Sequence, residues 1–317
     1  MNKVERVLNA MNNRPVDRPP VGFWHHFEGA DMAENFVNAQ VQYYRDSQTD
    51  FIKVMSDGIP YTLNATITCA SDWRKVTPQG KNSAFFRQTL ERCKRLSDAL
   101  QGECCTFYNI FSPYNVIREA FENADATVMA HLQEDPDAVN AAARAVGEDE
   151  AELAQALIQE GGMTGIYQSF QAAELDRFTA EEYRAWVRPS DLMVLTAANE
   201  AGGLNIGHYC SWWGRKNRLE DWQDYPAQVV NWGIYIEGMS LQDGRAFFGD
   251  KPVLGGFDNR KCGLLYTGSK EEIQAETRRI AAAIPVGLTV GADCTVPMDI
   301  DLERIRWVVE ALEGLAK

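Results

Sequence analysis

Two soft metal ligands, His208 and Cys210, stand two residues apart in the segment LNIGHYC. Side chains of an extended strand alternate between its two faces, so this spacing places both on one face, with Cα atoms roughly 6–7 Å apart. Imidazole nitrogen and thiolate sulfur are ligands that suit zinc. Cys294 follows another apolar segment far along the chain and supplies a third ligand if the fold brings the two segments together. These residues predict a zinc site.

Glu237 is a candidate for a fourth, weaker ligand, because it follows the apolar segment VVNWGIYI. A displaceable carboxylate oxygen would leave a position through which substrate reaches the metal, as at catalytic zinc sites. A purely structural role also remains possible for each of these residues. A strand-end carboxylate also pairs with arginine, a buried cysteine often serves as a small core residue, and a strand histidine is often a hydrogen-bonded polar group.

Elements that could position these ligands recur along the whole chain. Short apolar segments rich in β-branched and aromatic residues alternate with longer segments of helical periodicity, which favours parallel βαβ units. The expected strands are residues 19–24, 50–56, 104–111, 163–169, 204–210, 229–236, 252–258 and 287–293. Eight such strands in 317 residues predict a closed (β/α)8 TIM barrel, with residues 1–317 as a single domain. An open doubly wound sheet is disfavoured because no G-x-G-x-x-G or G-x-x-x-x-G-K motif follows a strand.

Helix boundaries support this alternation. Asp135-Pro136 is expected to begin a helix that ends at Gly161-Gly162, and Ser269 is expected to cap another helix. The polar region 57–81 is expected to be an extended loop that contains a small hairpin of its own.

Reactive residues of such a barrel lie at the C-terminal ends of the strands and in the loops that follow. His25 after the first expected strand and Asp57 after the second are therefore candidate catalytic residues, which would orient substrate or transfer protons. Gln168 and Ser169 at the fourth strand and Asp258 at the seventh are candidates for binding a cofactor. Near the metal motif, Tyr209, Trp212 and Trp213 could form an apolar wall that excludes water.

Composition excludes several classes of partner. The chain has 31 Lys and Arg residues against 45 Asp and Glu residues, and its net charge of −14 opposes binding to nucleic acid. No apolar run reaches the roughly 18 residues that cross a bilayer, and the N-terminus lacks the apolar core of a signal peptide. Seven cysteines form an odd, scattered set, which indicates reduced thiols. We therefore expect a cytoplasmic protein without a membrane or nucleic-acid partner.

Several sequence blocks resemble the uroporphyrinogen decarboxylase superfamily. They are, in order, RPVDRPPVGFW, FIKVMSDG, IYQSF with FTAEEYRAWVRP, and GADCTVPMDIDLERIRWVVEAL. The resemblance covers nearly the whole chain and implies a (β/α)8 barrel. The decarboxylases carry an R-Q-A-G-R type motif after the first strand, where this sequence reads WHHFEG (residues 24–29). The absence of these arginines removes a bidentate clamp for carboxylates and argues against porphyrinogen decarboxylation.

His208, Cys210 and Cys294 match the H-x-C…C zinc signature of the related methylcobamide:coenzyme M methyltransferases. Cobalamin-independent methionine synthase has a similar signature with an intervening glutamate, near the position of Glu237. The resemblance implies a resident Zn²⁺ ion and methyl transfer to or from a small-molecule thiol or methylated substrate. The second substrate would be a methylcorrinoid on a partner protein, because this sequence shows no corrinoid-binding D-x-H-x-x-G motif.

Two other functions remain open at this point. A decarboxylase of a carboxylated small molecule or tetrapyrrole would need cations at the barrel mouth, for which Arg118, Arg215 and Arg260 are candidates. A non-catalytic zinc- or corrinoid-binding protein would hold the same ligands in a closed site that does not exchange thiols.

Overall fold

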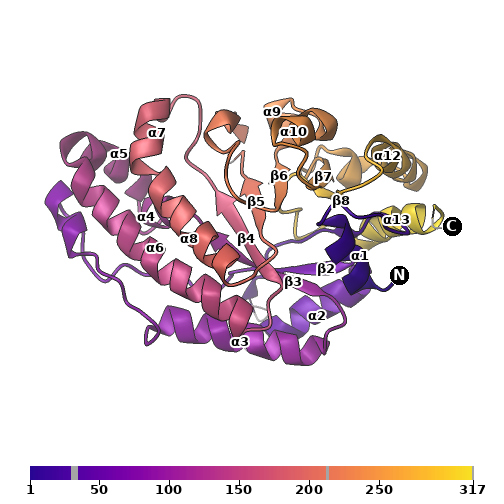
Figure 1. The fold of residues 1–317 in the computed structure, drawn as a ribbon, viewed down its shortest axis with the longest axis horizontal. Coiled ribbons are helices and arrows are strands. Elements are labelled where there is room, and N and C mark those ends of the chain that lie inside the picture. The colour runs from indigo at the N-terminus through magenta and orange to yellow at the C-terminus, as the bar shows by residue number, and fades with distance from the viewer. Residues whose placement is uncertain (30–34, 212–213, 316–317) are drawn as a thin grey trace.

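The computed structural model describes residues 1–29, 35–211 and 214–315, which form the predicted (β/α)8 barrel (Figure 1). All neighbouring strands pair in parallel, in the order β1-β8-β7-β6-β5-β4-β3-β2. The strands are β1 (Val21–Gly22), β2 (Phe51–Val54), β3 (Cys105–Phe111), β4 (Gly165–Phe170), β5 (Ile206–Tyr209), β6 (Val229–Trp232), β7 (Val253–Phe257) and β8 (Leu288–Ala292). Each expected segment contains one strand, so the strand prediction is confirmed.

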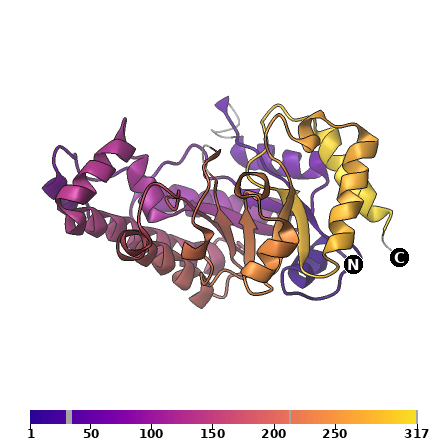
Figure 2. The same cartoon turned by 90° about the horizontal axis from the view of Figure 1, so that it is seen from above.

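Helices cover the outside of the barrel (Figures 1 and 2). They are α1 (Lys3–Ala10), α2 (Phe36–Ser47), α3 (Ala84–Leu100), α4 (Pro113–Arg118), α5 (Ala124–Glu134), α6 (Pro136–Gln159), α7 (Ala180–Trp186), α8 (Arg188–Glu200), α9 (Ile234–Glu237), α10 (Leu241–Phe247), α11 (Leu264–Thr267), α12 (Lys270–Ala283) and α13 (Leu302–Glu313). None of the described helices is both long enough and apolar enough to cross a membrane. Strands covered on both faces are buried throughout, which explains their nearly continuous apolar sequences.

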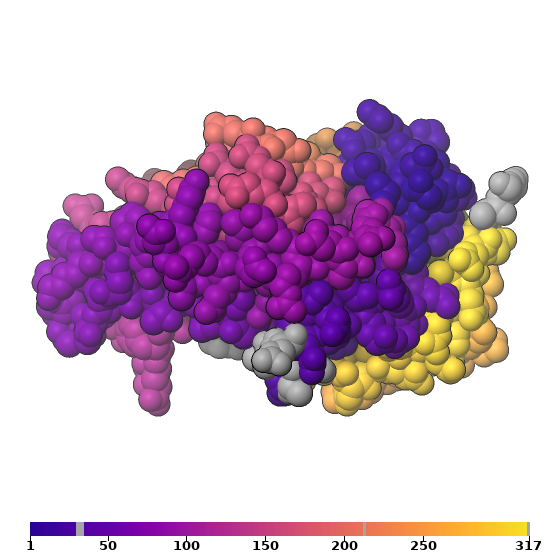
Figure 3. Space-filling model, turned by 90° about the horizontal axis from the view of Figure 1, so that it is seen from below, coloured from indigo at the N-terminus to yellow at the C-terminus, as the bar shows by residue number. Residues whose placement is uncertain are grey.

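Both expected helix starts are confirmed. Asp135 caps α6 by accepting a hydrogen bond from the Ala138 amide, and α6 ends before the expected glycine pair. Ser269 caps α12 in a capping box with Glu272. The first and last parts of the chain lie side by side at one end of the molecule (Figures 1 and 3).

Two local expectations were wrong. The sixth strand ends at Trp232, because Gly233 is followed by the helical turn α9, and a short apolar run does not distinguish strand from helix. Region 57–81 contains the 3₁₀ helix η2 (Ala70–Lys75) and no strand. Its two sides are joined through one side chain: Asn64 Nδ2 donates to the Thr77 carbonyl over 2.9 Å, and Asn64 Oδ1 accepts from the Thr77 amide over 3.2 Å.

The seam between β1 and β2 is closed by one buried carboxylate. The Asp50 amide donates to the Val21 carbonyl over 2.8 Å, and Asp50 Oδ2 accepts from the Val21 amide over 2.7 Å. Arg6 and Arg18 bind the same carboxylate over 2.8 Å and 2.7 Å. Asp50 is fully buried, so these partners satisfy a charge that would otherwise be costly to desolvate. The seam thus completes the barrel on which the ligands are mounted.

Candidate metal centre

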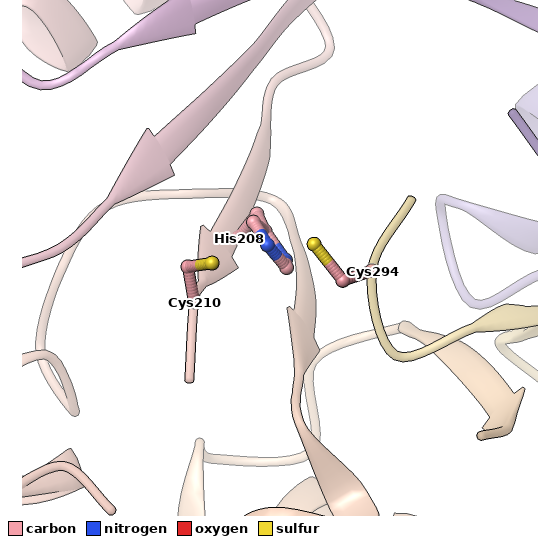
Figure 4. A group of neighbouring side chains, drawn as sticks. All are labelled: His208, Cys210 and Cys294. Atoms are coloured by element: carbon pink, nitrogen blue, oxygen red, sulfur yellow. The ribbon is translucent and has the colours of Figure 1, made fainter. Parts of the chain in front are cut away.

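His208, Cys210 and Cys294 lie together at the C-terminal mouth of the barrel. Their ligand atoms are all within 4.8 Å of one another, and no other group of three or more His, Cys, Asp or Glu residues of this kind occurs among the described residues. His208 is on β5, Cys210 follows that strand, and Cys294 follows β8. Figure 4 shows both sulfur atoms turned toward the imidazole. We call these three residues the ligand cluster.

Asn231 on β6 fixes the orientation and the tautomer of His208. Asn231 Nδ2 donates to the carbonyls of Leu254 (2.8 Å) and Ala292 (3.2 Å), so Oδ1 must face the imidazole. This oxygen lies 2.5 Å from His208 Nδ1 and also accepts the Tyr167 hydroxyl over 2.7 Å. Because the oxygen only accepts, Nδ1 carries the proton and Nε2 keeps its lone pair. Nε2 is buried and has no hydrogen-bond partner among the described residues.

The two cysteines of the ligand cluster share a hydrogen bond. The Cys210 thiol donates to Cys294, which raises the pKa of Cys210 and lowers the pKa of Cys294, while burial raises both. The nearby Lys53 ammonium favours the Cys294 thiolate further. The pair therefore favours one thiolate, the form in which cysteine binds a metal.

Lys53 of β2 places a buried cation beside the cluster. Its Nζ lies 4.2 Å from the Tyr167 ring centroid and 4.9 Å from the Trp24 ring centroid. Burial lowers the pKa of Lys53 to about 8, although Cys294 and Cys210 oppose that shift. The ammonium can thus stabilise negative charge on sulfur without binding a metal itself.

A cavity of about 280 Å³ opens onto the ligand cluster. Ser169, a candidate for binding a cofactor, lines it, and its hydroxyl donates to Asn109 Oδ1 over 3.0 Å. Gln171, two residues further along the chain, also lines it and hydrogen-bonds to Cys210. The barrel therefore provides a chamber with several polar side chains in front of the three ligands, which we call the ligand cavity.

Comparison with known proteins places the chain in a family. The family model for uroporphyrinogen decarboxylase (URO-D) matches residues 49–315, which is most of the chain. The chain belongs to the uroporphyrinogen decarboxylase family. The family resemblance of the sequence blocks is thereby confirmed. No curated protein is similar enough in sequence to count as a match.

Solved structures resemble this family member in fold. A methyltransferase from Methanosarcina mazei has a TM-score of 0.75 with 15% sequence identity, and the match covers 100% of each chain. The 3-keto-D-glucoside 4-epimerase from E. coli has a TM-score of 0.38 and 15% identity, over 74% of this chain and 97% of that one. The first likeness supports the barrel assignment.

In this family member, Asp57 lies at the mouth but His25 points elsewhere. Asp57 Oδ1 pairs with His26 Nδ1 over 2.8 Å, and Oδ2 accepts from the Phe27 amide over 3.0 Å. His26 lines the ligand cavity, whereas the His25 ring packs against Tyr43, 4.5 Å between centroids. Neighbouring side chains of an extended segment point in opposite directions, so only one of the two histidines can face the cavity. The predicted residue, His25, therefore does not face the ligand cavity, and the neighbouring His26 does.

Strand alternation also separates the two predicted residues of β4. Ser169 faces the ligand cavity, so Gln168 must face the helices, and its Nε2 donates to the Asp191 carbonyl over 3.1 Å. Asp258 is likewise absent from the described lining of the ligand cavity, and its carboxylate binds Arg260 over 2.7 Å. Neither Gln168 nor Asp258 is in position to bind a cofactor in the cavity.

Glu237 does not join the ligand cluster. Its Oε1 accepts from the Ser211 hydroxyl over 2.7 Å and from Asn217 Nδ2 over 2.8 Å. The same Asn217 nitrogen donates to the Cys210 carbonyl over 3.1 Å. The helical turn α9 carries Glu237 to this loop, so the residue supports the backbone after Cys210 and we do not carry it forward as a ligand.

Of the three residues of the expected aromatic wall, Tyr209 packs away from the ligand cavity. The Tyr209 ring stacks on Trp222 and Phe248, at centroid distances of 5.1 Å and 5.0 Å, between the barrel and its helices. Trp212 and Trp213 lie outside the described residues.

Asn231, Lys53 and Gln171 are the residues of the site that sequence reasoning missed. The sequence carries a signal for the first two: each is the one polar residue of a short strand that is otherwise apolar, VVNW and FIKV. A polar residue in a strand buried on both faces requires a partner. Gln171 lies just beyond β4 and carries no comparable signal.

Proposed function

We propose that this member of the uroporphyrinogen decarboxylase family is a zinc-dependent methyltransferase. It would move a methyl group between a methylcorrinoid, held by a separate protein, and a thiol acceptor. The proposal rests on one observation: the ligand atoms of His208, Cys210 and Cys294 lie within 4.8 Å of one another, and the buried Nε2 of His208 has no hydrogen-bond partner among the described residues. Buried polar atoms in proteins nearly always have a partner, and one nitrogen with two sulfurs is a donor set that suits zinc.

His208, Cys210 and Cys294 would hold the ion, and three protein ligands leave one position open for substrate. Bound zinc would supply the Lewis acidity that lowers the pKa of a substrate thiol toward neutral pH. Two cysteine ligands donate charge and so keep the substrate sulfur nucleophilic. The M. mazei protein of the same fold is a methyltransferase, which is compatible with this proposal.

Other residues of the site would prepare the thiol. Asn231 holds the imidazole in the metal-binding tautomer, and Lys53 stabilises negative charge in the cavity. The imidazole of His26 lines the cavity and is paired with Asp57, so it can accept the thiol proton.

A decarboxylase is the second candidate, because family membership favours it. Its carboxylated substrate would need free cations at the mouth. Arg118 binds Asp125 and Glu174, and Arg215 pairs with Asp176. Arg260 is engaged by its own carboxylate partner, and none of the three arginines is part of the described ligand-cavity lining. Among the described residues, Lys53 is the one lysine or arginine that lines the ligand cavity, and it lies beside the two thiols of the cluster. The pairings remove the three arginines as a clamp for carboxylates, which favours the methyltransferase.

The test is a methyl-transfer assay on zinc-loaded protein with methylcobalamin as donor and a panel of thiols. We expect loss of the methylcobalamin absorbance and formation of a thioether, detected by mass spectrometry. Cys294→Ala should abolish transfer, whereas Cys262→Ala, which removes an exposed cysteine outside the cluster, should leave it unchanged.

Two results would contradict the proposal. Release of carbon dioxide from carboxylated compounds without zinc would support the decarboxylase. Zinc that stays bound but does not respond to added thiols would support a non-catalytic binding protein.

A further inference from the structure

A second cavity, of about 650 Å³, lies beside the ligand cavity, and we call it the side cavity. It is formed by the loop after β2, the end of β3, and helices α4 and α6. Asn109, Phe111 and Glu119 line both cavities, so the two cavities adjoin. Its volume lies within the range of about 300–1,000 Å³ found for small-molecule sites.

The charged groups of the side cavity are all acidic. Asp57, Glu119 and Glu150 line it, and no lysine or arginine belongs to its lining in the described ranges. Asp57 already has partners in His26 and the Phe27 amide. Walls of one sign favour a ligand of the opposite charge.

Glu150 of α6 is the group whose burial most requires a ligand. Its side chain is 2% exposed, and Oε2 has no hydrogen-bond partner among the described residues. Burial, with the nearby Asp191 and Asp149, raises its pKa well above the ordinary value. Asn115 Oδ1, on the same wall, is also buried and without a partner. Asn115 Oδ1 can only accept, and Glu150 Oε2 accepts in the ionised form of the carboxyl, which a bound cation favours. A ligand that brings positive charge or N–H groups would therefore satisfy both atoms.

Aromatic rings line the same space. Tyr61 and Phe85 meet edge to face with centroids 5.2 Å apart, and the Tyr61 hydroxyl is held by Asp149 Oδ2 over 2.6 Å. Tyr108 and Phe111 also contribute to the lining. Aromatic faces attract organic cations, most strongly where water is excluded. The carboxylates of the side cavity form no close group of metal ligands in the described part of the chain, which favours an organic cation over a metal ion.

We infer that the side cavity binds an ammonium group and that the thiol acceptor is therefore an aminothiol. Its sulfur would lie at the ligand cluster and its cationic nitrogen in the side cavity. The identity of the sulfur end rests on the proposed function, whereas recognition of the cation depends only on the side cavity.

Isothermal titration calorimetry with choline and its neutral isostere, in which carbon replaces nitrogen, tests the cation site. Choline and the isostere differ in charge but have nearly the same shape. We expect choline to bind at least about tenfold more tightly than the isostere, to metal-free and zinc-loaded protein alike. Glu150→Gln and Glu119→Gln should each reduce this preference several-fold. Glu271→Gln, an exposed acid at the start of α12, is the matched control for net charge and should leave it unchanged.

Glu119 is exposed, so its variant remains informative if Glu150→Gln fails to fold. Equal binding of choline and isostere, no binding of choline at millimolar concentration, or an unchanged preference in Glu119→Gln would overturn the inference. Because metal-free protein serves in the assay, the two proposals fail separately. A protein that prefers choline but transfers no methyl group would contradict only the proposed function. A protein that transfers a methyl group but does not prefer choline would contradict only the inference of an aminothiol acceptor.

Discussion

Two buried polar clusters of this barrel differ in how completely their atoms are paired. At the seam, both oxygens of Asp50 are bound by Arg6, Arg18 and a backbone amide. At the mouth, Asn231 holds one side of the His208 ring, and the buried nitrogen on the other side has no partner in the described part of the chain. The seam joins the consecutive strands β1 and β2, and the mouth joins β5 to the segment after β8, yet only the seam is complete by itself.

The contrast separates a structural role from a binding role. A fully paired buried cluster contributes to the free energy of folding and has no capacity left for a ligand. A cluster with an unpartnered donor atom keeps that capacity, and unsatisfied buried atoms in native proteins call for an explanation. We therefore expect substitutions at the seam to affect stability and substitutions at the mouth to affect metal binding.

The largest effect is expected at the seam. Asp50→Ala leaves the buried Arg18 guanidinium without its close carboxylate and leaves Arg6 with Asp17 alone, which should reduce the free energy of unfolding by about 3–5 kcal/mol. Chemical denaturation measures this change. The zinc content per folded chain should stay unchanged, and a loss of zinc in a stable Asp50→Ala protein would break the comparison.

Asp191, a buried acid that hydrogen-bonds to tyrosines and not to a guanidinium group, sharpens this comparison. Asp191 accepts the hydroxyls of Tyr183 and Tyr225, and burial raises its pKa to about 7. Between about pH 4 and pH 7 the folded chain therefore keeps a proton that the unfolded chain releases. As pH rises through this range, Asp191 lowers the free energy of unfolding by up to about 1.4 kcal/mol per pH unit. Asp191→Asn should flatten that part of the stability profile, measured by denaturation across this range. An unchanged slope would contradict the assignment.

At the mouth, Asn231→Leu removes the acceptor that orients His208. Loss of such an outer-shell partner typically weakens metal binding by about 10–100-fold. Competition with a chromophoric zinc chelator measures the change. Asn231→Asp keeps an acceptor and should retain most of the affinity. Equal losses in both variants would show that the amide acts through packing alone.

The smallest effect is expected for Glu237→Gln. Glu237 supports the loop after Cys210 through hydrogen bonds from Ser211 and Asn217. Its substitution should therefore change zinc affinity by less than about tenfold, the lower end of the effect of losing a residue that hydrogen-bonds to a ligand. The same chelator competition applies. A loss as large as that of a cysteine variant would restore Glu237 as a ligand.

Much of the fold was predictable because its signals are local. A short apolar run in the sequence marks each strand, and the capping residues Asp135 and Ser269 mark the starts of two helices. The failures arose where local signals are ambiguous: GIYI after β6 is apolar in either conformation, and the loop 57–81 is held by side-chain bonds between distant residues such as Asn64 and Thr77.

The site was predictable where spacing alone fixes direction. His208 and Cys210 share a strand face, and barrel closure brings Cys294 to them. Positions chosen only for lying at strand ends were less reliable, because alternation turns Gln168 outward while Ser169 faces the cavity. Partners such as Asn231 are set by the register between strands, which no single segment of the sequence contains.

The central claim is that the ligand cluster holds one zinc ion. Elemental analysis of purified protein, wild type beside Cys210→Ala and Cys294→Ala, tests it most directly. The account predicts about one zinc per wild-type chain and almost none in either folded variant, since two remaining ligands bind weakly. Folded wild-type protein that takes up no zinc, or variants that retain it fully, would contradict the account.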